Sequence, residues 1–230
     1  MAIHPTIEIR RCRREDFSQV AALSYRTGYG GEDVAASGLF TDRLLFELLF
    51  CRPYLRFELE SCFVAAQRGA ASRIAGYVLG CPDSARHELL FRRWNVPRVL
   101  GRIAVHTMWR DRATVCELLR WGRDNPWRTA NPAGPDFPAH LHIGVLPDLQ
   151  GQGIGGLLLT ALEDHLRARG VPGVHLVTSS HHRKAIPFYE KHGYRRLLER
   201  SHRMWSGLAD YRSLVFVKSL EAGEGATLGR

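Results

Sequence analysis

The chain has 230 residues, of which 45% are hydrophobic and 24% charged, a composition typical of a globular protein that buries a core. Its formal net charge of +9 favours polyanionic ligands but does not distinguish nucleic acid from a phosphate-rich small molecule. Met1–Thr6 lacks the basic and then apolar layout of a signal peptide, and no apolar run approaches roughly 18 residues, so we expect a cytoplasmic protein without a membrane span.

The five cysteines are scattered along the chain, at Cys12, Cys51, Cys62, Cys81 and Cys116. Their number is odd, and none forms a Cys-x-x-Cys pair or stands beside a histidine pair at the spacing of zinc ligands. We therefore interpret them as reduced and mostly buried side chains, and expect no metal site.

The N-terminal part of the sequence predicts a strand, two helices and a hairpin. Residues 7–10 alternate as in a strand, and the apolar residues within 14–23 recur near helical spacing. Asp42 has the side chain of an N-cap and precedes a short apolar helix. Two strand-like runs, 61–66 and 73–80, are joined by a glycine-containing connection, which predicts an antiparallel pair.

Residues 82–138 form a long basic segment that contains several tryptophans. Helical patterns fall around 84–94, 98–108 and 111–121, and a loop rich in proline and glycine follows. We interpret this segment as a helical insertion into the domain and not as a domain of its own.

The C-terminal half alternates between strands and helices. Leu158, Leu162 and Leu166 recur at i, i+4 and i+8, which marks one apolar helix face. The remaining predicted elements are a strand over 141–146, a strand over 174–178, a helix over 183–191 and strands over 194–198 and 213–218. This order predicts a mixed α/β fold, with one domain over residues 1–220 and a flexible tail over 221–230.

Four glycines crowd into the turn before the leucine-containing helix: Gly151, Gly153, Gly155 and Gly156. Glycine lets the backbone approach a ligand closely, and the unpaired N–H groups of a helix N-terminus favour an anion. The alternative interpretation is a tight turn with close helix packing. The pattern lacks the later acidic residue of a dinucleotide site and the Lys-Ser/Thr pair of a P-loop.

Two segments resemble the signatures of the GNAT acetyltransferase superfamily. Val145–Leu158 is similar to its acyl-CoA-binding motif, Gln/Arg-x-x-Gly-x-Gly/Ala after a strand, and Ala185–Tyr194 looks like its second signature. The clear resemblance covers residues 140–200. It implies a central mixed, twisted sheet of about seven strands that is splayed at the fourth strand and flanked by helices, with the insertion between the third and fourth strands.

The resemblance also implies acetyl-CoA as cofactor, in the gap of the splayed sheet. The backbone of 143–145 would pair with the pantetheine arm, and the amides of 152–156 would bind the pyrophosphate. His182 stands where the family often has Asn, and faces either an adenosine phosphate or solvent. The predicted cofactor contacts are Ile143, Gly144, Val145, Gln150, Gly151, Gln152, Gly153, Ile154, Gly155, Gly156, His182 and Tyr189.

Tyr189 is the first candidate for the chemistry. By resemblance it stands where many family members place the tyrosine that protonates, or hydrogen-bonds to, the coenzyme A sulfur. A phenol with a pKa near 10 can donate a proton to a thiolate. The alternative is a tyrosine that only packs its helix.

The general base is less clear from the sequence. His140 and His142 have the residue type for proton abstraction at neutral pH. Side chains alternate across a strand, however, and several family members carry the base on the face that here holds Ala139 and Leu141. Asp83 follows a predicted strand and is the other candidate base, or else a surface-turn residue. Tyr189, Asp83 and His142 are the predicted catalytic residues.

A narrower resemblance concerns three short motifs: Cys62–Ala66, Gly76–Asp83, and Arg92–Trp94 with Pro97. These look like the bacterial relatives of the acetyltransferase-like C-terminal domain of O-GlcNAcase. The eukaryotic members of that subgroup are described as acetyltransferase-like, which leaves catalysis open while the intact glycine motif favours cofactor binding.

The sequence therefore predicts an acetyl-CoA-dependent N-acetyltransferase that acts on a small-molecule or protein amine, as a monomer or homodimer. The alternative is a catalytically weak or inactive acetyl-CoA-binding module. We do not expect nucleic acid as a partner, since only the charge suggests it. Several arginines of the insertion would either attract an acidic acceptor or form a solvated helix face: Arg86, Arg92, Arg93, Arg98 and Arg102.

Overall fold

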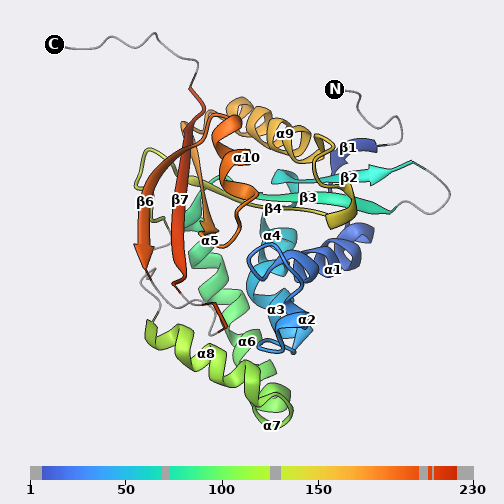
Figure 1. Ribbon diagram of the computed structural model, residues 1–230, viewed down its shortest axis with the longest axis vertical. Helices are drawn as coiled ribbons and strands as arrows, with labels where there is room; N and C mark the ends of the chain where they lie inside the picture. Colours follow the sequence, from blue (N-terminus) through green and yellow to red (C-terminus); the bar gives the residue numbers. More distant parts are fainter. Residues whose placement is uncertain (1–6, 69–72, 125–130, 202–206, 209, 222–230) are drawn as a thin grey trace.

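The computed structural model describes residues 7–68, 73–124, 131–201, 207–208 and 210–221. A seven-stranded sheet in the order β1-β2-β3-β4-β5-β7-β6 forms its centre (Figure 1). The strands are β1 Ile7–Arg11, β2 Cys62–Gln67, β3 Ile74–Cys81, β4 Ala139–Val145, β5 Gly173–Ser179, β6 Arg195–Ser201 and β7 Arg212–Ser219. Only β4 and β5 pair in parallel, so the predicted mixed α/β fold is confirmed.

The sheet opens between β4 and β5. The two strands pair at Ala139 with Val174 and at His140 with His175, and no further pair joins them among the described residues. On its other edge β4 continues to pair with β3 as far as Val145. The predicted splay at the fourth strand is therefore confirmed, and the backbone of β4 beyond His140 faces the opening.

Helices cover both faces of the sheet (Figure 1). Helix α9, Ile154–Ala168, lies on one face, where its leucines at 158, 162 and 166 are fully buried, as their spacing predicts. The other face carries α1 Phe17–Thr27, α3 Arg43–Phe50 and α4 Arg52–Phe57. The remaining short elements are η1 Arg14–Asp16, α2 Val34–Ser37, η2 Leu59–Ser61, η5 Pro147–Leu149 and α10 Ala185–Lys191.

The insertion lies between β3 and β4, as predicted, but its helices differ from the expected three. It comprises α5 Ser84–Leu90, η3 Phe91–Asn95, α6 Val96–Arg102, η4 Ile103–Thr107, α7 Met108–Arg110 and α8 Arg112–Asp124. The break expected near Pro97 is absent: the helical run continues through this proline, which follows the π-helical turn η3, where the backbone hydrogen bonds already depart from the i→i−4 pattern that a proline interrupts. The elements η3 and η4 are π-helical turns within one long helical run.

The insertion shares a core with the N-terminal helices. Trp121 of α8 stacks on Phe40 at 5.5 Å between ring centroids and contacts the edge of Phe50. Val99 of α6 belongs to the same cluster. A single domain over 1–220 remains a prediction, and the expected tail lies, apart from Glu221, outside the described residues.

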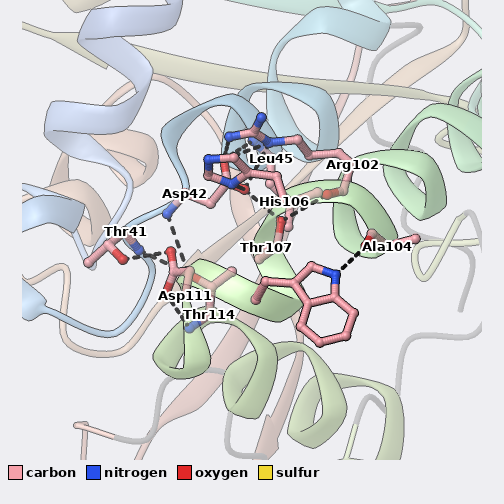
Figure 2. A network of polar contacts seen from close by, with 10 residues as sticks. Thr41, Asp42, Leu45, Arg102, Ala104, His106, Thr107, Asp111 and Thr114 are labelled. Atoms are coloured by element: carbon pink, nitrogen blue, oxygen red, sulfur yellow. Dashed lines mark hydrogen bonds and ion pairs between the residues drawn. The ribbon is translucent and has the colours of Figure 1, made fainter.

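A buried polar network joins α3 to the insertion (Figure 2). The Asp42 carboxylate accepts a hydrogen bond from the first turn of α3, which confirms it as N-cap. It also accepts from Arg102 Nε at 3.0 Å and from Thr107 Oγ1 at 2.6 Å. Asp111 accepts from Thr41 Oγ1 at 2.6 Å and caps α8. These contacts fix the position of the insertion against α3.

Within the described part of the chain, no helix combines the length and the apolar character that crossing a bilayer requires.

Candidate active site

The glycine turn has a left-handed backbone at two positions. Gly151 has φ +79° and Gly153 has φ +85°, conformations that residues with a Cβ rarely adopt. Apart from the chain neighbours, no atom of the described residues lies within 4 Å of a Cβ built at either glycine, so both face open space. Gly153 is the N-cap of α9 and no side chain caps this helix end. The turn therefore presents the first backbone N–H groups of α9 as hydrogen-bond donors.

The other two glycines of the turn serve helix packing. A Cβ at Gly155 would lie 3.0 Å from the Phe188 ring, and one at Gly156 would lie 2.6 Å from His192 Nε2. Both partners belong to the region of α10 and its C-terminus. The two interpretations of the glycine cluster thus apply to different members: two shape an open turn, and two allow α10 to approach α9.

A cavity of about 420 Å³ lies in front of the turn, where the sheet is splayed. Its lining includes most of the residues predicted to contact the cofactor, namely Ile143, Gly144, Val145, Gln150, Gly151, Gly153, Ile154, Gly155, Gly156, His182 and Tyr189. Gln152 is the exception: its side chain turns back and donates to the carbonyl of Asp148 at 3.4 Å. The structure thus gathers nearly the whole predicted set around one cavity.

This cavity is also lined by residues that were not predicted from the sequence. Thr27 and Gly31 come from the end of α1 and the loop after it, and Phe188, Lys191 and His192 come from α10 and its end. Gly31 has φ +97°, and a Cβ there would lie 2.5 Å from His182 Nε2. The adjacent glycines at positions 30 and 31 were the one signal for this loop in the sequence. No sequence pattern, however, linked them to His182, in the second half of the chain.

A second cavity, of about 220 Å³, adjoins the first. Both are lined by Thr27, Gly31, Ile143, His182 and Tyr189. The second cavity extends between α1, α3, β3 and β5, and much of its wall is aromatic: Phe46, Phe50, Tyr77 and Tyr211. The molecule therefore offers two adjoining spaces, and Tyr189 borders both.

Tyr189 is buried in α10. Its ring contacts Phe216 at 5.8 Å and Tyr194 at 5.9 Å between centroids. Burial, and then the nearby Tyr77, raise the pKa of the Tyr189 phenol above its usual value. The group therefore keeps its proton at neutral pH, and it is both packed in its helix and placed at the junction of the cavities.

His142 lines the second cavity, and its pKa is lowered to about 4. Although the ring borders the cavity and is exposed there, the surrounding protein removes water that would hydrate an imidazolium, and His87 and His175 add repulsion. His142 is thus a neutral imidazole at pH 7. It can accept a proton, but only weakly.

His140 is bonded at both ring nitrogens, unlike its neighbour. Ser84 Oγ donates to the carbonyl of Pro138 at 2.6 Å, so its lone pair accepts from His140 Nδ1 at 2.7 Å. Nε2 must then accept from the Tyr54 hydroxyl. This arrangement fixes the tautomer and leaves His140 no free position for proton abstraction. Burial lowers the pKa of His140 well below its usual value.

Asp83 lies outside both cavities as their linings are described. Its carboxylate is the N-cap of α5 and accepts from the N–H groups of Ala85 and Arg86 at 2.9 and 3.0 Å. Helix capping explains the position of the Asp83 carboxylate. A catalytic role for it stays a prediction.

The arginines of the insertion are also absent from both described linings. Three are paired with carboxylates: Arg86 with Glu58, Arg92 with Glu88 and Arg102 with Asp42. The guanidinium of Arg93 lies over the ring of Trp94 at 5.5 Å. The contacts of Arg86, Arg92 and Arg93 favour a solvated helix face, whereas Arg102 belongs to the buried network around Asp42.

Comparisons with known proteins identify the family of the chain. A model of the Acetyltransferase (GNAT) family matches residues 35–194, more than half of the chain. An acetyltransferase of Pectobacterium atrosepticum is 42% identical over 53 residues, which are 23% of this chain and 38% of that protein. One of Sodalis glossinidius is 39% identical over 56 residues, 24% of this chain and 39% of that protein. The chain thus matches well under half the length of these curated relatives.

Solved structures share the fold over nearly the whole chain. The crystal structure of SsHAT has a TM-score of 0.70 and 28% identity, and the match covers 95% of this chain and 100% of that one. The ribosomal-protein-S18-alanine N-acetyltransferase of Escherichia coli has a TM-score of 0.54 at 17% identity, covering 97% and 99%, which shows the fold alone. With its splayed sheet, its glycine turn and the matching family model, the chain belongs to the acetyltransferase (GNAT) family.

Proposed function

We propose that this chain is an acetyl-CoA-dependent N-acetyltransferase that acetylates an amine of a small molecule or a protein. The observation that carries the proposal is the junction of two cavities at Tyr189 and His182. One cavity has the donors and the open backbone that suit a pyrophosphate, and the other provides an adjoining space for an acceptor. Two reactants can meet only where such spaces are continuous.

The residues around the first cavity fit acetyl-CoA. Its volume lies in the range of about 300–1,000 Å³ that is common for small-molecule sites. Gly151 and Gly153 leave room for a phosphate at the N-terminus of α9. The ammonium groups of Lys184 and Lys191 belong to residues of the same lining and favour anions. The open edge of β4 would bind the pantetheine arm. When bound, acetyl-CoA supplies an activated acetyl thioester.

Two residues of the chain would handle protons. Tyr189 holds a proton at its phenol oxygen because burial raises its pKa, and it would donate that proton at the junction of the cavities. His142 is neutral and would accept a proton from the acceptor, directly or through one water. A base with so low a pKa is weak, so the amine should arrive largely unprotonated.

The second cavity suits an acceptor with an apolar or aromatic part. Phe46, Phe50 and Tyr211 contribute rings to its wall, and Tyr77 is hydrogen-bonded to Ser24 and Thr27 of α1. Such walls bury apolar area and stack on rings. The acceptor amine would enter this space beside Tyr189.

The short motifs around Cys62–Ala66 and Gly76–Asp83 support a place among the bacterial relatives of the O-GlcNAcase C-terminal domain. A cytoplasmic protein, as monomer or homodimer, is the accompanying expectation.

The test measures free thiol and acetylated product with acetyl-CoA and a panel of small amines and peptides. We expect one acceptor class to release thiol well above the rate without acceptor, and mass spectrometry to find one added acetyl group on it. Tight binding of acetyl-CoA without acetylation of any acceptor would favour the alternative, a cofactor-binding module. Lack of acetyl-CoA binding would contradict both.

A further inference from the structure

Three buried side chains meet on the α4 side of the sheet, outside both cavities. Glu58 lies between α4 and η2, Cys81 is the last residue of β3, and His87 belongs to α5. Their exposed fractions are 6%, 0% and 7%. One side-chain atom of each, a carboxylate oxygen, the sulfur and a ring nitrogen, lies within 4.8 Å of the other two. Three elements, of which β3 and α5 are consecutive in the chain, thus converge on one point.

His87 has a buried nitrogen that the protein does not satisfy. Its Nδ1 is inaccessible to solvent and has no hydrogen-bond partner among the residues that the structure describes. The nearest described carboxylate oxygen, Glu58 Oε1, is 3.6 Å away, which is longer than a hydrogen bond. The Tyr54 ring packs against the imidazole at 4.5 Å and restricts its rotation. Because buried polar atoms are almost always paired, this nitrogen requires a partner within the cluster.

The donor set selects the kind of partner. A thiolate, an imidazole and a carboxylate together are typical zinc ligands, whereas magnesium and calcium prefer oxygen ligands alone. Cys81 is protonated, and its thiol now donates to the carbonyl of Asp83 at 3.1 Å. On binding Zn²⁺ the thiol would release this proton, and the thiolate and the Glu58 carboxylate would balance the two charges of the ion.

The surroundings support such a site. Arg86 Nη1 donates to Glu58 Oε1 at 2.9 Å and holds the carboxylate in place, as outer groups do around metal ligands. The backbone carbonyl of Glu58 is bound by the thiol of Cys62 at 3.3 Å, which fixes the same residue from the other side.

We propose that Glu58, Cys81 and His87 bind one zinc ion, with water in the remaining position. The ion would tie the start of the insertion helix to the end of β3 and to the α4–η2 junction. The sequence predicts no metal site because the ligands are separated by 23 and 6 positions and come from three elements, a spacing that no short motif describes.

The test is the metal content of the full chain, without an affinity tag, purified from zinc-supplemented medium. We expect one zinc ion per chain, and after exchange with cobalt a thiolate-to-cobalt charge-transfer band. Cys81→Ser and His87→Gln should each abolish the zinc and the band. Cys51→Ser, at a buried cysteine outside the cluster, and Cys116→Ser, at an exposed one, should retain both.

A second measurement keeps the test decisive if a ligand variant fails to fold. Wild-type protein stripped with a chelator and titrated with zinc should bind one equivalent, release one proton and gain thermal stability. Wild-type protein that takes up no zinc in either experiment, or zinc that Cys81→Ser retains in full, would overturn the proposal.

Discussion

Tyr189 is the residue whose environment is most closely tied to the proposed chemistry. Its phenol is buried, keeps its proton and borders both cavities. Tyr189→Phe retains the ring packing and removes the donor. We expect thiol release to slow by about 100-fold, the lower end of the range for general acids, while the dissociation constant for acetyl-CoA changes little. Steady-state kinetics and calorimetry measure both, and an unchanged rate would assign Tyr189 to packing alone.

His142 gives a prediction about acid stability. Its pKa is about 4 in the folded protein and about 6.5 in an unfolded chain. Between these values the unfolded chain binds more protons, so this group lowers stability as pH falls through the window. His142→Gln should therefore lose less stability than wild type between pH 7 and pH 4.5.

Urea unfolding at several pH values measures this difference. The two proteins should have the same pH dependence above pH 7, where the imidazole is neutral in both states. Parallel curves below pH 6 would show that His142 titrates normally. The neighbours that act on it are His87 and His175, so neither is changed in this experiment.

The polar network around Asp42 governs how the insertion is attached to α3 (Figure 2). Burial alone would raise the pKa of this carboxyl, but hydrogen bonds from Arg102 and Thr107 outweigh it and hold the pKa below its usual value. Asp42→Asn leaves Arg102 without its anion. We expect a loss of about 3 kcal/mol in the free energy of unfolding, as for a broken buried pair.

The matched control is Arg43→Ala, which breaks an exposed pair with Glu47 on the same helix. It should change stability by no more than about 1 kcal/mol, as for surface pairs. Equal effects of the two substitutions in chemical denaturation would mean that the network does not join the insertion to α3.

The strands and helices were largely predictable because their signals are local. The leucines of α9 and the N-cap at Asp42 depend on neighbours in sequence, and both are confirmed. The continuous helical run through Pro97 was missed because a proline reads, in sequence alone, as a helix break, and no local pattern announces the π-helical turn before it.

At the scale of the whole molecule, the site could be predicted only where the family motif covers it. The glycine turn and Tyr189 lie around one cavity, as the resemblance implies. Thr27 and Gly31 were not predicted, because only tertiary packing brings the loop after α1 to α10. The zinc cluster is invisible in sequence for the same reason, since its three ligands share no element.

The proposed function depends above all on the binding of acetyl-CoA at the turn of Gly151 and Gly153. Gly153→Ala puts a Cβ into the open space before α9, whereas Gly170→Ala does so at the opposite end of that helix, also with φ positive and no atom within 4 Å. Both should cost about 1 kcal/mol of stability through backbone strain. Comparing the two variants therefore separates the effect of backbone strain from the effect of lost contact with acetyl-CoA.

Titration calorimetry of acetyl-CoA into these two variants and wild type is the most direct measurement. We expect one binding site in wild type and in Gly170→Ala, and affinity about 10- to 100-fold weaker in Gly153→Ala, as for lost hydrogen bonds to a charged group. Equal affinity in all three proteins, or no binding to wild type, would contradict this expectation.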